Sequence, residues 1–78
     1  FTNEIELTNY KFAVEFEKIK DLNLLARPRF SSTGFYGKLI KNNDKIYFKY
    51  NEENAHNAKG QHVVFFYDNF VVGGGEIK

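Results

Sequence analysis

Residues 62–75 read HVVFFYDNFVVGGG, and this stretch carries the clearest indication of the fold. β-branched and aromatic residues fill positions 63–67, a composition typical of a buried strand. Asp68-Asn69 follows as a short turn, and a second apolar segment begins at Phe70. Two strands joined this closely predict a β-hairpin.

The second strand of this hairpin runs into three consecutive glycines, Gly73 to Gly75. Glycine costs backbone entropy in a strand and packs nothing, so a run of three needs a reason. From the residues alone, two reasons stay open: a flexible exit from the strand, or a backbone that passes close to another element. A phosphate-binding loop is excluded, because no Lys-Ser or Lys-Thr pair follows the glycines.

Further strands are predicted outside the hairpin from alternating or extended apolar patterns, at residues 3–7, 22–30, 35–41 and 45–50. Pro28 is compatible with a strand only at an edge, an end or a bulge. Asn42-Asn43-Asp44 has the composition of a hairpin turn. About six short strands predict an all-β fold, a small closed antiparallel β-barrel, because closure removes the sheet edges that promote aggregation.

The region between the first two strands is ambiguous. Helical spacing relates Phe12, Phe16 and Ile19, whereas Phe12, Val14 and Phe16 alternate as in a strand. A short helix over 13–20 is favoured, because its charged residues would then share one solvent-facing side.

The 78 residues are expected to form a single domain. Residues 1–21 would supply a lead-in strand and the short helix, and residues 22–78 the β-barrel. The chain starts with Phe1 rather than Met, which indicates a piece of a longer protein.

The chain offers little catalytic chemistry. It has no Cys, which excludes a disulfide, a thiol nucleophile and a Cys-ligated metal. Its two histidines, His56 and His62, would need two more ligands to hold a metal, and Ser31-Ser32 has no nucleophile-elbow context. No catalytic, cofactor-binding or metal-binding residue is therefore expected. No apolar stretch approaches the roughly 20 residues that span a bilayer, so no membrane contact is expected.

Positive charge is concentrated in the middle of the chain. Residues 22–49 contain six basic residues and one acid, although the formal net charge of the whole chain is +1. A basic face beside aromatic side chains is typical of nucleic-acid contact. The alternative is a solvated β-surface on which Lys protects a sheet edge.

The most suggestive cluster in this basic block is Arg27, Arg29 and Phe30. An Arg side chain can bind phosphate or stack on a base, and an aromatic ring can stack on a base face. The alternative is a strand end whose arginines pair with Glu15 or Glu17, which would contribute about 0–1 kcal/mol.

Several motifs resemble the C-terminal domain of the bacterial tRNA-specific 2-thiouridylases. In chain order they are Leu24-Leu25-Ala26-Arg27, Arg29-Phe30, Gly60-Gln61, Val64-Phe65-Phe66-Tyr67-Asp68 and Gly73-Gly74-Gly75-Glu76-Ile77. The resemblance covers residues 22–78 well and residues 1–21 loosely. The chain departs from the family pattern at Phe30, where Tyr is usual, at Ser31-Ser32 in place of Arg-Gln, and at Lys59 in place of Pro.

The resemblance implies an accessory tRNA-binding β-barrel of a larger enzyme, with no catalysis by this fragment alone. The parent enzyme would be an ATP-dependent sulfurtransferase that adenylates and then thiolates C2 of the wobble uridine; older naming calls it a methyltransferase. ATP would bind elsewhere in the parent, and no cofactor is implied for this fragment. The implied partners are the anticodon region of tRNA, the other domains of the same chain and a sulfur-donor protein, in the cytoplasm.

Three tRNA-contact residues follow from the matched motif positions, namely Arg29, Phe30 and Gln61. Arg27 and Lys38 are added from the distribution of charge alone. A purely structural barrel, which docks other domains or a protein partner without touching RNA, is the alternative. The resemblance also favours close packing as the reason for the glycine run, since it would let the last strand close the barrel.

Overall fold

The computed structural model describes residues 3–28, 34–50 and 60–78. The elements formed by these residues are β1 (Asn3–Phe12), α1 (Phe16–Ile19), β2 (Leu24–Pro28), β3 (Phe35–Asn42), β4 (Lys45–Tyr50), β5 (His62–Tyr67) and β6 (Phe70–Ile77). Arg29, Phe30, Ser31-Ser32 and His56 lie outside the described residues.

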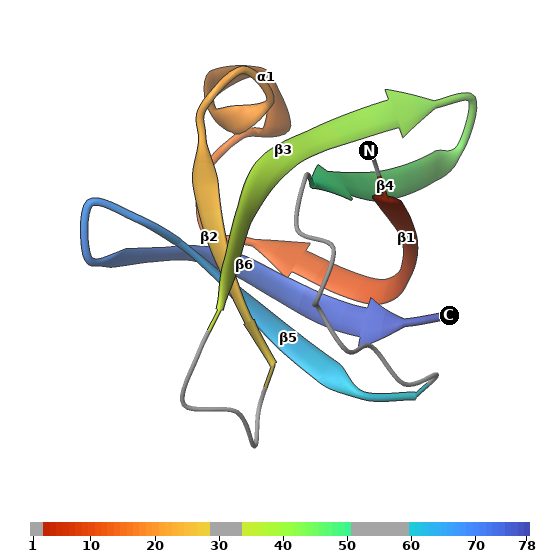
Figure 1. The fold of residues 1–78 in the computed structure, drawn as a ribbon. Helices are drawn as coiled ribbons and strands as arrows, with labels where there is room; N and C mark the ends of the chain where they lie inside the picture. The colour runs from red at the N-terminus through yellow and green to blue at the C-terminus, as the bar shows by residue number, and fades with distance from the viewer. Residues whose placement is uncertain (1–2, 29–33, 51–59) are drawn as a thin grey trace.

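The strands form a closed antiparallel barrel in the order β1-β4-β3-β2-β5-β6 (Figure 1). β1 closes the ring, because it pairs with β4 along Asn3–Leu7 and with β6 from Leu7 onward. The predicted all-β barrel of about six strands is confirmed. The strand order is not the chain order, so β2 lies between β3 and β5.

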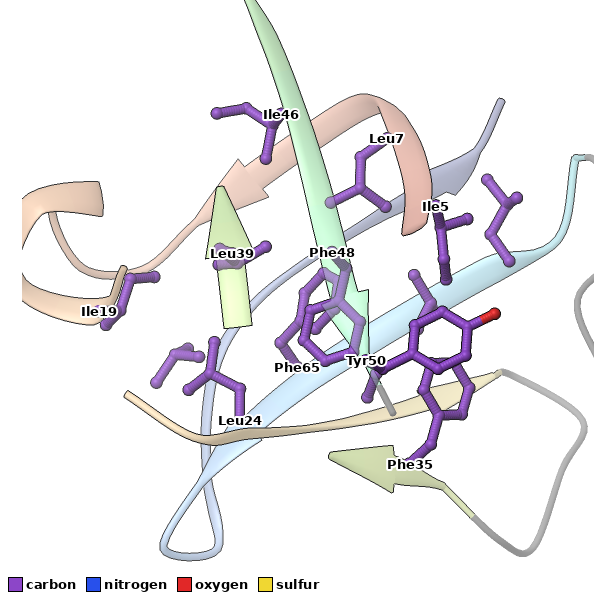
Figure 2. Packing of buried hydrophobic residues seen from close by; sticks show 14 residues of the cluster. Ile5, Leu7, Ile19, Leu24, Phe35, Leu39, Ile46, Phe48, Tyr50 and Phe65 are labelled. Carbon is purple, nitrogen blue, oxygen red and sulfur yellow. The ribbon is translucent and has the colours of Figure 1, made fainter. Parts of the chain in front are cut away.

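Except at the register shifts in β1 and between β5 and β6, alternate side chains of the strands fill the interior of the barrel, as the sequence periodicity predicts. Phe48 of β4 and Phe65 of β5 are fully buried, with their ring centroids 5.0 Å apart. Phe35 and Tyr50 pack beside them at a centroid distance of 4.5 Å (Figure 2). Each buried aromatic side chain removes about 150–250 Å² from water, and this compensates for the small size of the core.

The glycine run lies where β6 passes close to β1. A methyl group on Gly73 would collide with the Phe12 ring and lie 2.8 Å from the Lys11 carbonyl oxygen. A methyl group on Gly75 would lie 3.0 Å from Tyr10 Cβ. The close-packing explanation is therefore confirmed, and the glycines let β6 close the ring.

The first strand is longer than predicted, since it continues past Leu7 to Phe12. A register shift between Thr8 and Lys11 marks a β-bulge, at which Asn9 has a φ of 48° and its Nδ2 donates to Glu76 Oε2 at 3.3 Å. The helix is shorter than the predicted 13–20, since Ala13 N donates to Val72 O of β6 at 2.9 Å and only Phe16–Ile19 is helical.

The turn between β5 and β6 agrees with its sequence. Tyr67 pairs with Phe70, so Asp68 and Asn69 are the two loop residues. Their φ values of 48° and 71° are both positive, as a type I′ hairpin turn requires. Asp and Asn tolerate this backbone region better than most residues do, which explains the turn at this position.

Candidate nucleic-acid interface

Positive charge is displayed on the outer face of β3 and β4. Lys38 and Lys49 are both exposed and are register partners on adjacent strands. Like charges directly opposite each other destabilise a sheet. Glu4 of β1 is the register partner of Lys49 on its other side, so this lysine has one neighbouring acid across the strands.

A groove of about 900 Å³ lies between α1 and the outer face of β3. Its charged lining residues are Lys20, Lys38, Lys41, Lys49, Glu17 and Asp21. Four lysines against two acids give the groove a net positive charge. Tyr36, which is 60% exposed, lies in the same lining. The groove therefore combines cations with an exposed aromatic side chain.

One ion pair reduces the free charge of the groove. Lys20 Nζ lies 2.8 Å from Glu17 Oε2, and this contact lowers the pKa of Glu17 and raises the pKa of Lys20. Lys41 also lowers the pKa of Glu17 through its charge. Within residues 3–28, 34–50 and 60–78, Lys38, Lys41 and Lys49 form no ion pair. Three lysines are thus left to attract an anionic ligand.

Arg27 of β2 lies beside a second hollow, of about 320 Å³. Its guanidinium carbon is 5.6 Å from the centre of the Phe66 ring, a cation–π arrangement. The hollow is lined by Asn23, Leu25, Arg27, Tyr36, Phe66, Asp68 and Asn69. Among the described residues, Arg27 forms no ion pair with Glu15 or Glu17, the pairing that the alternative expected. Glu17 pairs with Lys20, and Arg27 lies over Phe66.

The structure brings some of the predicted site residues together and separates others. Tyr36 belongs to both hollows, and it links Lys38 in the groove to Arg27 in the smaller hollow. Gln61 lines neither of these two hollows. It lies before β5, where its backbone oxygen accepts a hydrogen bond from Ile77 N at 2.9 Å.

Tyr36 is a residue that the sequence argument did not select for the site. The available signal was its spacing: Tyr36 and Lys38 are two residues apart on one strand, so they face the same side of the sheet. Phe66 gave no such signal, because Arg27 and Tyr36, its cationic and aromatic neighbours in the hollow, come from other strands.

No group of three or more His, Cys, Asp or Glu side chains that could hold a metal occurs in the described part of the chain. His62 Nε2 instead lies 3.4 Å from Glu76 Oε1 across β5 and β6. Among the described residues, no helix is long and apolar enough to cross a membrane.

Comparison with known proteins identifies the family of this barrel. Residues 2–77 match the family described as the aminomethyltransferase beta-barrel domain. The whole chain is 78% identical to part of a protein of Fusobacterium nucleatum subsp. nucleatum, the tRNA-specific 2-thiouridylase MnmA 2, and spans 23% of its length. No solved structure matches the chain. The chain therefore belongs to the aminomethyltransferase β-barrel domain family, and its resemblance to the C-terminal domain of tRNA-specific 2-thiouridylases is confirmed.

Proposed function

We propose that this chain is the accessory tRNA-binding barrel of an ATP-dependent tRNA 2-thiouridylase, a cytoplasmic sulfurtransferase that thiolates C2 of the wobble uridine. The name of the 78% identical relative supports this proposal. In it, ATP and a sulfur-donor protein act on the parent enzyme outside this barrel, and the barrel helps to hold the anticodon region of the tRNA.

The observation that carries the proposal is the exposed Lys38–Lys49 pair beside the groove. Two opposed ammonium groups repel each other, and a bound phosphate would attract both groups and so offset their repulsion. Phosphate contacts of this kind orient an RNA without reading its sequence. This is the role expected of an accessory domain that positions tRNA for chemistry performed elsewhere.

The second candidate is a structural barrel that docks another domain of the same chain. It is favoured by exposed apolar side chains on the β5–β6 hairpin, where Phe70 is 71% exposed and Val71 is 56% exposed. Exposed apolar patches are typical of protein–protein contacts. This patch lies on different strands from the Lys38–Lys49 pair, so the two candidates predict different sensitive residues.

The test is tRNA binding by the full-length parent protein, measured over a range of salt concentrations. Lys38→Gln and Lys49→Gln should each lower the affinity and reduce the slope of log K against log salt by about 0.7–0.9, the value for one lost phosphate contact. Lys11→Gln is the matched control, since Lys11 is exposed but lines neither hollow. Unchanged slopes in both folded variants would favour the docking barrel.

A further inference from the structure

The smaller hollow beside Arg27 is lined by aromatic and polar side chains that phosphate binding in the groove would not require. We propose that it holds one unpaired nucleobase of the RNA, stacked between Tyr36 on one side and the Arg27–Phe66 pair on the other. This inference rests on the proposed RNA contact and adds a base-binding site to it. The base is a different nucleotide from the wobble uridine, which must reach the catalytic part of the parent enzyme.

The register of three strands builds the walls and floor of the slot. Tyr36 of β3 pairs with Leu25 of β2, and Leu25 pairs with Phe66 of β5, so the three form one row on the outer face. Adjacent strands lie about 4.8 Å apart, which separates the backbones of Tyr36 and Phe66 by about 10 Å. The two rings thus flank the hollow of about 320 Å³, and Leu25 lies between them.

Arg27 strengthens one wall of this slot. It lies two residues after Leu25 on the same face of β2, and its guanidinium group is held 5.6 Å from the centre of the Phe66 ring. Both a guanidinium plane and an aromatic ring are surfaces on which unpaired RNA bases stack. Because this cation already has a defined position, less side-chain entropy is lost when a base binds.

Polar groups around the slot give it a preference among bases. Asn23 and the turn residues Asp68 and Asn69 complete the lining. A carboxylate accepts hydrogen bonds and cannot donate them, so Asp68 favours a base with an exocyclic amino group. Adenine, cytosine and guanine carry that group, whereas uracil has none and offers a carboxylate only its N3–H, which lies between two carbonyl oxygens. We therefore expect uracil to bind most weakly.

The first experiment measures tRNA affinity of the full-length parent protein with substitutions at Tyr36. Tyr36→Ala should weaken binding by about 5-fold to 150-fold, the range for one lost stacking contact, with an unchanged salt slope because no cation is removed. Tyr36→Phe keeps the ring and should bind like the wild type. Since Tyr36 is 60% exposed, the Ala variant should stay folded, which circular dichroism would check.

The outcomes separate this inference from the proposed function. If Lys38→Gln weakens binding and Tyr36→Ala does not, the phosphate contact stands and the base slot is wrong. If neither variant changes the tRNA affinity, both the phosphate contact of Lys38 and the base slot are wrong. If Tyr36→Phe is as weak as Tyr36→Ala, the hydroxyl group acts rather than the ring, and the stacking proposal is overturned.

The second experiment tests the base preference with the pentanucleotides rA5, rC5 and rU5 as probes of the full-length protein. The first two should bind more tightly than rU5. Asp68→Asn should reduce this difference, because an amide can also donate to a uracil carbonyl. The variant suits the turn, since Asn is favoured at positive φ. Equal binding of all three probes by the wild type would overturn the preference and the role of Asp68.

Discussion

Gly73 and Gly74 are neighbours in sequence but have different amounts of space. A side chain at Gly73 would meet the Phe12 ring and the Lys11 carbonyl oxygen, both on β1. At Gly74 the nearest atom to an added methyl group is the Val63 carbonyl oxygen, 3.0 Å away. The residues left a flexible exit and a close approach open, and the family resemblance favoured the close approach. Neither could identify Phe12 as the partner, because that contact exists only after the barrel closes.

This difference predicts an order of stability at the residue scale. Gly73→Ala should lower the free energy of unfolding by about 1–3 kcal/mol, the usual cost of forcing an extra methyl group into a packed site. Gly74→Ala should cost less and serves as the matched control. Urea denaturation of the two variants measures both values. A larger loss for Gly74→Ala would contradict the proposed packing of β6 against β1.

At the scale of elements, the short helix α1 has one well-defined electrostatic contact. Glu17 and Lys20 are one turn apart and both are exposed to solvent, so their pair adds little to stability. The lowered pKa of Glu17 means that this stabilisation is fully present at pH values above the pKa that Glu17 has in the unfolded chain. It is lost as the pH falls through the folded-state pKa.

An NMR titration of the Glu17 carboxyl group tests this pair. In the wild type its pKa should lie below the ordinary value of 4.5, and Lys20→Gln should raise the pKa towards that value. Lys18→Gln is the control, because Lys18 is not among the groups that shift Glu17. A Glu17 pKa that responds equally to both substitutions would show that the 2.8 Å contact is not the main cause.

The strands could be predicted from the sequence where apolar and polar residues alternate without interruption. In β4 the alternation of Ile46, Phe48 and Tyr50 identified both the strand and its buried face. In residues 8–12 the alternation is broken, because the bulge at Asn9 inserts an extra residue. Residues 10–12 stay extended through pairing with β6, a distant partner that local periodicity does not reveal.

For the whole molecule, the candidate site was predictable in part. The distribution of charge selected Arg27 and Lys38, and these residues line the two hollows. It did not select Tyr36 and Phe66, because they become neighbours of one hollow only when β2 lies between β3 and β5. Arg29 and Phe30 lie outside the described residues, so their predicted contact with tRNA stays a prediction.

The overall charge of the barrel limits how tightly it can bind RNA by itself. Its formal net charge is +1, and the cations of the two hollows other than the paired Lys20 are Arg27, Lys38, Lys41 and Lys49. Four phosphate contacts would give a salt slope of at most about −3 to −4. The isolated 78-residue chain should therefore bind tRNA weakly, as a filter-binding titration would show. A steeper slope would mean that further cations take part.

The pairing of β1 with β6 also has a consequence during synthesis on the ribosome. β1 is the first strand of the barrel to leave the exit tunnel, yet its partner along Lys11 and Phe12 is the stretch around Gly73, and Lys78 N donates to Glu6 O. At about 5–20 residues per second, several seconds separate the two strands. During that interval one edge of β1 has no partner and can recruit another nascent chain. The barrel can close only after translation of its last strand, so the ring stays open until β6 is made.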